Sequence, residues 1–297
     1  MSLDQTLNTS KNRRHYDYIA DAWQHLLGQN FHWGYFREPD MSLDAATDAL
    51  IDALVERIDL SAQTHLLDVG CGIGGPARYL AQRHGCAVTG FSTSEEGIAR
   101  ARDYAREAGL EDRLAFEVRN ALDSGFETRA FDSVILLEMS HLIRDKGALI
   151  AESCRPAKTG GIVSLCDLTL RRKLSAREIV AWQEDIRLME RSFGKARLET
   201  LDHYRDLFER CALEEVETVD ISEEVIPTIG NWRRNAEENR ATLIRHVEEG
   251  DVEDFIRSCD ILERFYTEGI WGYGIVSGRR TDREPASLDG AAGRALF

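Results

Sequence analysis

The sequence of 297 residues lacks the features of a secreted, membrane-spanning or metal-stapled protein. Its six cysteines are scattered and form no C-x-x-C pair, so the sequence indicates neither a zinc site nor a framework of disulfides. No segment approaches the roughly 18 uncharged residues of a membrane helix, and residues 1–30 contain no apolar stretch typical of a signal peptide. We therefore expect a cytoplasmic chain whose thiols are buried and reduced.

Positive charge is also scarce, because 37 basic residues face 52 acidic ones and leave a formal net charge of -15. A chain with this charge repels phosphate backbones and anionic lipids. The sequence also has no set of His, Asp and Glu at ligand spacing, which disfavours a magnesium-dependent mechanism, although acids far apart in the sequence can converge in space. We therefore expect no nucleic acid, membrane or metal as a partner.

Residues 66–170 alternate short apolar runs with amphipathic stretches, which is the pattern of βαβ units around a parallel sheet. The pattern predicts strands over residues 65–69, 87–91, 114–119, 131–137 and 161–167. Between them it predicts helices over residues 75–83, 94–108 and 145–154. The sequence therefore predicts an α/β fold with a doubly wound sheet.

Further elements flank this central block. Helices are predicted over residues 11–27, 42–58, 176–191, 201–210, 232–248 and 252–268, and strands over residues 215–221 and 271–279. We interpret residues 1–60 as an N-terminal helical segment that covers the active site, and residues 281–297 as a flexible tail. Residues 61–280 would form the core, with insertions at about 172–210 and 226–268 that cover the substrate.

A glycine-rich turn joins the first predicted strand to the helix that follows it. Gly70, Gly72 and Gly75 satisfy G-x-G-x-x-G, a pattern that also occurs in dinucleotide-binding enzymes. Those enzymes place an acidic residue about 20 positions further on for the ribose hydroxyl, whereas the second strand here ends at Ser92. Asp68, just before the turn, suits a cationic group such as the amino group of a methionine moiety. Dinucleotide binding and a turn without a ligand are the alternatives.

Three segments then carry a resemblance to a known family: LDVGCGIGGPA at residues 67–77, VTGFS at 88–92 and FDSVILLE at 131–138. Together they resemble the class I S-adenosylmethionine-dependent methyltransferases. NFHWGYF at 30–36 and SLDAATD at 42–48 are similar to the branch of the rebeccamycin-type sugar O-methyltransferases and the tocopherol and sterol C-methyltransferases. The resemblance implies a seven-stranded, mostly parallel, Rossmann-like sheet with a helical cover. It also implies S-adenosylmethionine as the cofactor and S-adenosylhomocysteine as its product.

The resemblance assigns cofactor contacts to the ends of the first four strands: Asp68, Gly70, Cys71, Gly72, Gly74, Ser92, Asn120, Ala121, Leu122 and Glu138. The glycine turn would hold the methionine half, Ser92 the ribose and the loop at residues 120–122 the adenine. Asn120 departs from the family pattern, because relatives usually have an aspartate there, and Gly97 replaces a glutamine of the sugar-modifying relatives. An asparagine carbonyl still accepts a hydrogen bond, but a role in capping its own loop is the alternative for Asn120.

Two ionisable residues follow the fourth and fifth predicted strands. His141 lies just beyond the fourth strand and Asp167 ends the fifth, and the carboxyl ends of such strands open onto the same crevice. A histidine can accept the proton of a hydroxyl, and a carboxylate can orient the histidine or hold the substrate. The resemblance to sugar O-methyltransferases implies these catalytic roles, and a structural hydrogen-bonding histidine is the alternative.

Aromatic residues near the N-terminus complete the candidate site. Tyr16 is predicted to join His141 and Asp167 at the catalytic centre by closing over the sulfonium, since cations pack on aromatic faces with about 0.5 to 2 kcal/mol. Trp33, Tyr35 and Met189 are predicted to contact the substrate. For Trp33 and Tyr35 the alternative is that they anchor the N-terminal segment on the core.

The sequence thus predicts a methyltransferase of secondary metabolism that methylates a hydroxyl with His141 as the general base. C-methylation of a prenyl or alkene substrate through a carbocation and N-methylation are the alternatives within the family. A non-catalytic cofactor-binding protein and a dehydrogenase are the alternatives outside it. A homodimer is a further expectation, because an N-terminal helix that covers a pocket can also pack on a neighbouring subunit.

Overall fold

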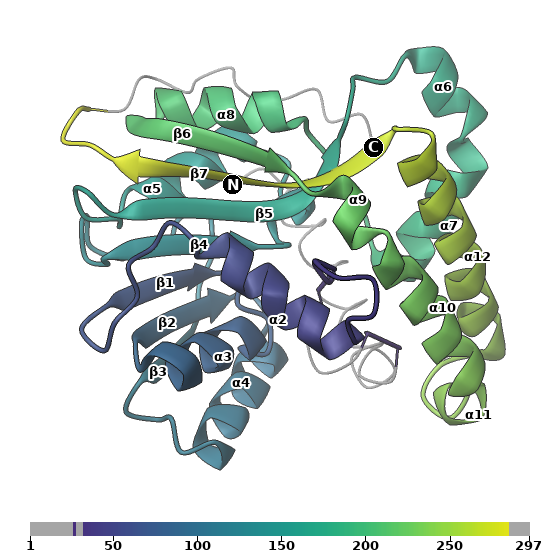
Figure 1. Cartoon of the computed structure of the whole chain (residues 1–297), viewed down its shortest axis with the longest axis horizontal. Helices are drawn as coiled ribbons and strands as arrows, with labels where there is room; N and C mark the ends of the chain where they lie inside the picture. Colours follow the sequence, from purple (N-terminus) through teal and green to yellow (C-terminus); the bar gives the residue numbers. More distant parts are fainter. Residues whose placement is uncertain (1–25, 28–31, 285–297) are drawn as a thin grey trace.

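The computed structural model describes residues 26–27 and 32–284. Within them a seven-stranded sheet has the order β3-β2-β1-β4-β5-β7-β6 (Figure 1). The strands are β1 (His65–Val69), β2 (Ala87–Ser92), β3 (Leu114–Val118), β4 (Ser133–Leu137), β5 (Ile162–Leu170), β6 (Leu213–Asp220) and β7 (Trp271–Arg280). The first five are parallel, and β7 is antiparallel to β5 and β6. This arrangement confirms the doubly wound, mostly parallel sheet that the sequence predicts.

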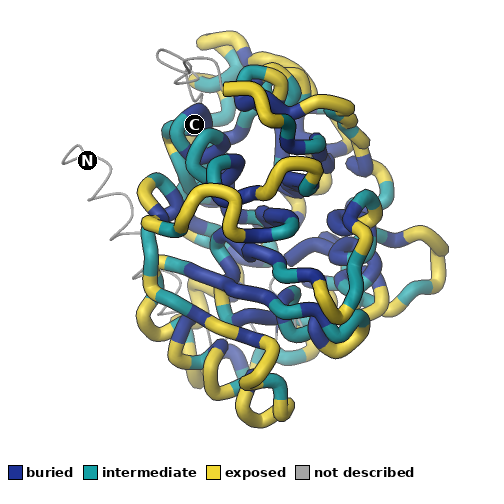
Figure 2. The backbone as a smooth tube through the Cα atoms, turned by 90° about the vertical axis from the view of Figure 1, so that its left-hand side faces the viewer, coloured by how far each residue is buried: buried dark blue, intermediate teal, exposed yellow. Residues whose placement is uncertain are grey.

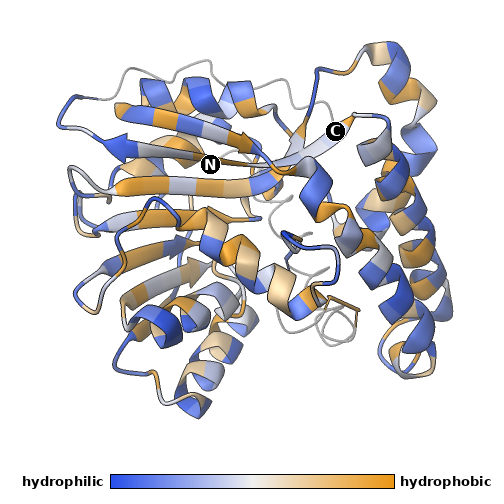
Figure 3. Cartoon of the chain, viewed as in Figure 1, coloured by the Kyte–Doolittle hydropathy of each residue, from blue (hydrophilic) through white to orange (hydrophobic). Residues whose placement is uncertain are grey.

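Helices cover both faces of the sheet because successive strand residues point to opposite sides. Ile135 packs in the apolar cluster that includes α2 (Leu43–Leu54), α3 (Gly75–His84) and α4 (Glu95–Glu107). Its neighbour Leu136 packs in a second cluster with α5 (Lys146–Cys154) and α8 (Leu201–Arg210). Strands of a sheet that is buried on both faces have nearly continuous apolar sequences. The central strands are accordingly buried in Figure 2 and largely hydrophobic in Figure 3.

A group of helices lies beyond the carboxyl ends of the parallel strands (Figure 1). It consists of α6 (Ala176–Ala181), α7 (Gln183–Phe193), α9 (Ser222–Val225), α10 (Pro227–Glu238), α11 (Arg240–Leu243) and α12 (Glu249–Thr267). The long helix α12 packs against both α7 and α10, and the tilted rings of Phe193 and Phe255 are in contact with centroids 5.3 Å apart. None of the helices in the described part of the chain is both long enough and apolar enough to cross a membrane.

Two helices predicted as continuous are broken in the structure. The prediction over residues 176–191 divides at Trp182, whose indole packs on Phe265 with centroids 5.3 Å apart, so a tertiary contact accompanies the break. The prediction over 232–248 divides at Asn239, where both the backbone N–H and the side-chain amide donate to the Asn235 carbonyl at 2.9 Å. An asparagine that bonds the backbone in this way competes with helix continuation.

Strand β5 is longer than predicted, because its pairing with β7 continues to Leu170 and Trp271. The prediction that the strand ends at Asp167 was therefore wrong. The parallel partner β4 nevertheless stops at Leu137, opposite Cys166, so Asp167 lies one residue past the end of the β4 ladder. Most of the helix predicted over residues 11–27, including Tyr16, and most of the predicted tail lie outside the described residues.

Candidate functional site

The glycine turn after β1 has a backbone that only glycine fits comfortably. Gly70 and Gly74 have φ of 81° and 75°. A Cβ on Gly70 would lie 2.7 Å from the Met139 side chain, and one on Gly74 would lie 2.6 Å from the Phe116 ring. At Gly72, with φ of 53°, a Cβ would instead meet no atom within 4 Å. The turn is therefore packed closely against the protein on its inner side and open at Gly72, where a ligand can approach the backbone.

Cys71 attaches this turn to the neighbouring strand β2. Its N–H and that of Gly70 both donate to the Phe91 carbonyl, at 3.1 and 2.9 Å. Its side chain fills the space above Gly90 of β2, where an added Cβ would lie 2.8 Å from the cysteine Cβ. Burial raises the pKa of the Cys71 thiol well above its ordinary value, so the thiol stays protonated and packs as an apolar group.

Asp68 precedes the turn and is 1% exposed. Its Oδ2 atom has no hydrogen-bond partner in the part of the chain that the structure describes. Burial raises the pKa of its carboxyl to about 7. A buried carboxylate oxygen without a partner is costly unless a ligand supplies one, and a cationic amino group is the partner that favours the ionised form. Asp68 therefore fits the amino group of a methionine moiety.

The first turn of α4 lies directly beside the glycine turn. Ser94 caps this helix and accepts from the Gly97 N–H at 3.0 Å, while Ser92 at the end of β2 accepts from the Ser94 N–H at 3.3 Å. A Cβ on Gly97 would lie 3.2 Å from the Gly72 carbonyl oxygen. The glycine at position 97 thus permits a close approach between the helix and the turn, in which a larger side chain would crowd the glycine backbone.

The loop after β3 is closed by its own asparagine. Asn120 Oδ1 accepts from the Leu122 N–H at 3.0 Å, and Asn120 pairs with Asp123 in an isolated bridge. Ala121 is buried in the core and Leu122 packs against it from a partly exposed position. The loop-capping alternative for Asn120 therefore has a structural basis, although a carbonyl oxygen with two lone pairs can accept a second hydrogen bond.

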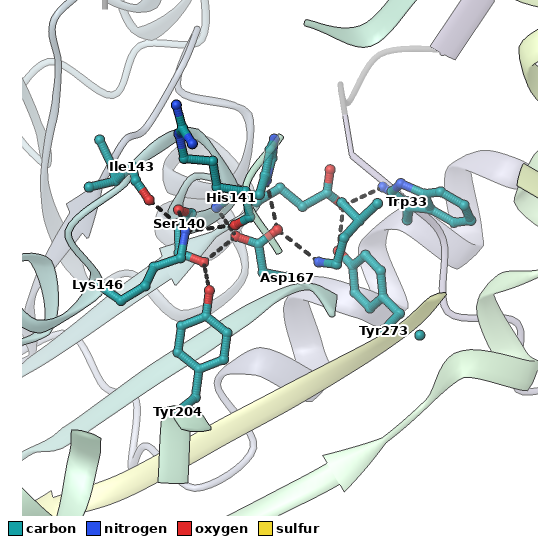
Figure 4. Close-up of polar contacts among 12 residues, drawn as sticks. Trp33, Ser140, His141, Ile143, Lys146, Asp167, Tyr204 and Tyr273 are labelled. Carbon is teal, nitrogen blue, oxygen red and sulfur yellow. Dashed lines mark hydrogen bonds and ion pairs between the residues drawn. The ribbon is translucent and has the colours of Figure 1, made fainter. Parts of the chain in front are cut away.

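Glu138, directly after β4, joins the sheet to the segment around Trp33. It has a left-handed backbone, with φ of 48°, and its N–H donates to the Cys166 carbonyl at 2.9 Å. Its Oε1 accepts from the Trp33 N–H at 2.7 Å and from the Tyr273 hydroxyl (Figure 4). Burial, outweighing these two bonds, raises the pKa of the Glu138 carboxyl to about 8. Sequence analysis missed Tyr273, which is 135 residues away from Glu138.

His141 and Asp167 are brought together as predicted from their strand ends. The His141 Nδ1 lies 2.7 Å from Asp167 Oδ1, and the His141 N–H donates to Oδ2 at 3.0 Å (Figure 4). The His141 side chain is 12% exposed, while that of Asp167 is fully buried. Burial alone would raise the pKa of Asp167, but the His141 ring, the Ser140 hydroxyl and the Lys146 ammonium together hold it below its ordinary value. Asp167 is therefore a carboxylate that fixes the imidazole.

Three buried residues that sequence analysis missed surround this pair. Ser140 donates to Asp167 Oδ2 at 2.6 Å, and its hydroxyl lies 2.7 Å from the Tyr204 hydroxyl of α8. Lys146, the first residue of α5, donates to three backbone carbonyls around the turn that carries His141. Ser140 and Lys146 lie close to His141 in the sequence, so their proximity was a usable signal. Tyr204 had none, because only the packing of α8 on the sheet brings it near.

Two of the three predicted substrate residues, Trp33 and Met189, pack among the cover helices, whereas Tyr35 lies beside α2, where its N–H donates to the Ala46 carbonyl at 2.8 Å. Trp33 is 3% exposed, and its ring packs on Trp232, Tyr266 and Tyr273 with centroids 4.9, 5.2 and 5.8 Å apart. Met189 of α7 is buried in the same apolar cluster. Tyr35 is only partly buried, and the Arg37 guanidinium lies 5.1 Å from its ring centroid. Trp33 thus has the anchoring contacts of the alternative interpretation.

Comparisons with known proteins match this chain to methyltransferases and cyclopropane synthases. The family model described as mycolic acid cyclopropane synthetase matches residues 4–263. The 27-O-demethylrifamycin SV methyltransferase of Amycolatopsis mediterranei is 31% identical over 90% of this chain and 96% of its own length. The chloroplastic tocopherol O-methyltransferase of Arabidopsis thaliana is 30% identical over 71% of this chain and 65% of its own length. The cyclopropane synthase MmaA2 from Mycobacterium tuberculosis superposes with a TM-score of 0.82 at 16% identity, covering 92% of this chain and 98% of that chain.

Proposed function

This chain belongs to the mycolic acid cyclopropane synthetase family and is an S-adenosylmethionine-dependent methyltransferase, and from that premise we propose that it methylates a hydroxyl group of a small secondary metabolite with His141 as the general base. Membership of the family confirms the predicted cofactor and excludes the dehydrogenase alternative. We propose, in addition, which atom accepts the methyl group, which residue is the base and what the other site residues do. Relatives named for O-methylation support a hydroxyl acceptor.

When bound, S-adenosylmethionine supplies an electrophilic methyl group on a positively charged sulfur. We infer that Asp68 receives the amino group of the methionine half, because its Oδ2 is buried and lacks a partner among the described residues. The open backbone at Gly72 lets the same half approach the turn. Ser92 would bind the ribose, and the loop of Asn120, Ala121 and Leu122 the adenine.

The His141–Asp167 pair carries the proposal of a general base. Because Asp167 is ionised, Nδ1 is the imidazole nitrogen that donates to it, and the lone pair of the neutral ring then lies on Nε2. Asp167 Oδ1 also accepts from the Leu168 N–H at 2.8 Å, which fixes the carboxylate itself. The ring is thus held in one tautomer and one orientation, ready to take the proton of an acceptor hydroxyl as the methyl group is transferred.

Replacement of the base tests the proposal directly. In His141→Ala we expect kcat to fall by about 10²-fold or more, because general-base catalysis contributes about 10²- to 10⁴-fold. Binding of S-adenosylhomocysteine, measured by calorimetry, should stay within a few-fold of the parent, since no hydrogen bond or ion pair among the described residues joins His141 to the glycine turn. His84→Ala is the matched control, because this histidine is the last residue of α3, the helix that begins at the glycine turn and leads away from it. A kcat of His141→Ala within a few-fold of the parent would contradict the base assignment.

C-methylation is the second candidate, and the aromatic cluster around Trp33 is the observation that favours it. Aromatic faces stabilise cations, and four rings gather here: Trp33, Trp232, Tyr266 and Tyr273. An enzyme that forms a carbocation would tolerate loss of His141 and lose most of its rate in Trp33→Leu. The opposite pattern is expected for a hydroxyl acceptor.

We also infer a cytoplasmic chain that acts on a small molecule, with the helices beyond the strand ends selecting the acceptor. The net charge of -15 supports a partner that is neither nucleic acid nor an anionic membrane. Light scattering of the purified chain would test the expected homodimer.

A further inference from the structure

Lys146 is a charged residue in a position where charge is unfavourable. Its side chain is fully buried, and it is the first residue of helix α5. The N-terminus of a helix carries a partial positive charge, so acidic residues are favoured there and a lysine is not. Asp145 already caps this helix by accepting from the Ala148 N–H at 2.9 Å. Helix formation therefore gives no reason for a lysine at this position.

The contacts of the ammonium supply the reason. Nζ donates to the backbone carbonyls of Ser140, Ile143 and Arg197, at 2.5, 2.6 and 2.8 Å (Figure 4). An ammonium has three N–H donors, so each of them is used. Ser140 and Ile143 are the two sides of the short helical turn that carries His141. The lysine therefore closes this turn on itself.

The third carbonyl links the turn to a distant part of the chain. Arg197 lies in the segment between α7 and α8, 51 residues from Lys146. Its own N–H donates to the His141 carbonyl at 2.7 Å. The peptide groups on either side of this residue thus hold the His141 turn from two directions, one directly and one through the ammonium.

The same charge also acts on the partner of His141. Burial lowers the pKa of Lys146 to about 8, while Asp167 and Glu199 act in the opposite direction and favour the charged ammonium. The ammonium in turn helps to keep Asp167 ionised, although it forms its bonds with backbone carbonyls. Lys146 therefore acts on both parts of the pair: it binds the backbone of the turn that carries His141, and its charge favours the ionised form of Asp167, which orients the imidazole.

We propose that Lys146 is a positioning residue for methyl transfer: its ammonium ties the 140–143 turn to the Arg197 segment and so holds the His141 ring against Asp167. This role rests on the proposed function of His141. It assigns to Lys146 an effect on the rate of the chemical step and none on cofactor binding.

The test is a double-mutant cycle on the full-length enzyme with Lys146→Met and His141→Ala. Methionine preserves the length of the side chain and removes the charge and all three donors. We expect Lys146→Met to lower kcat at least tenfold, with binding of S-adenosylhomocysteine within about twofold of the parent. Lys158→Met is the matched control, because this exposed lysine pairs with Asp132 at the opposite end of the strands. It should keep the kcat of the parent.

The double variant separates positioning from general structural damage. If Lys146 acts only through His141, the variant with both changes has the kcat of His141→Ala alone, since residues that act as a unit are not additive. Independent losses that multiply would overturn the proposal, as would a kcat of Lys146→Met equal to that of the parent. If His141→Ala itself retains full rate, the proposed function fails, which is a separate result.

Folding must be monitored throughout, by circular dichroism and urea unfolding. Lys146→Gln is the second variant, because its neutral amide retains two donors, and its kcat should lie between those of the parent and Lys146→Met. If both variants fail to fold, Lys146 is a structural residue and the positioning role is wrong.

Discussion

At the scale of single residues, three carboxyl groups of the candidate site are all buried, but their pKa values shift in different directions. Asp68 and Glu138 have raised pKa values of about 7 and 8, whereas the pKa of Asp167 is lowered. The difference follows from their partners, because Asp167 faces an imidazole, a hydroxyl and an ammonium. Asp68 Oδ2 has no such partner within the described residues, so its carboxyl is the one that a cationic ligand changes most.

The raised pKa of Asp68 leads to a prediction for the pH dependence of cofactor binding. A cationic amino group requires the ionised carboxylate, so binding releases a proton wherever the free carboxyl is protonated. Affinity for S-adenosylhomocysteine should therefore fall about tenfold for each pH unit below 7 and level off above it. Calorimetry between pH 5.5 and pH 8 measures this slope, and Asp68→Asn should bind weakly with little pH dependence. A constant affinity of the parent across this range would exclude Asp68 as the linked group.

At the scale of elements, the bond between Glu138 and Trp33 ties the segment before α2 to the end of β4. Glu138→Ala strands two buried donors, the Trp33 N–H and the Tyr273 hydroxyl, and each unpaired group costs about 1–3 kcal/mol. We expect the free energy of unfolding, measured in urea, to fall by at least the cost of one such group, about 1–3 kcal/mol. Glu138→Gln, which keeps an oxygen acceptor, should lose less. Equal stability of the alanine variant and the parent would show that this contact contributes nothing.

The helices and strands differ in how far sequence patterns predict them. Apolar runs located the parallel strands, because burial on both faces of a sheet leaves a strong local signal, and the G-x-G-x-x-G pattern located the glycine turn. The division of the cover helices at Trp182 and Asn239 depends on tertiary packing and on a side-chain bond, which periodicity does not record. The extension of β5 past Asp167 likewise depends on β7, a strand more than 100 residues later in the sequence.

The candidate site shows the same boundary between local and long-range information. His141 and Asp167 were predicted to meet because each follows a neighbouring parallel strand. Tyr204 and Tyr273 reach the site from 64 and 135 residues away from their partners, through the packing of α8 and the antiparallel pairing of β7. No spacing in the sequence relates these residues to the strand ends. Long-range contacts of this kind become visible only in the folded chain.

At the scale of the whole molecule, the sheet brings three functional groups to the carboxyl edge of its parallel strands. Asp68 lies near the end of β1 and the glycine turn follows that strand, the His141 turn follows β4, and Asp167 lies on β5 just past the end of β4. Helices α6 to α12, apart from α8, lie beyond this edge (Figure 1). The residues proposed to bind the cofactor and the proposed base therefore lie near one another at this end of the strands, on the side where the cover helices lie.

One labelling experiment identifies the atom that accepts the methyl group. The enzyme is incubated with S-adenosylmethionine carrying a ¹³C-labelled methyl group and with extracts of the producing organism, and the labelled product is isolated and examined by NMR. We expect a single labelled methyl bound to oxygen, formed in the parent and lost in His141→Ala. A labelled methyl bound to carbon or nitrogen, formed equally well without His141, would contradict this expectation.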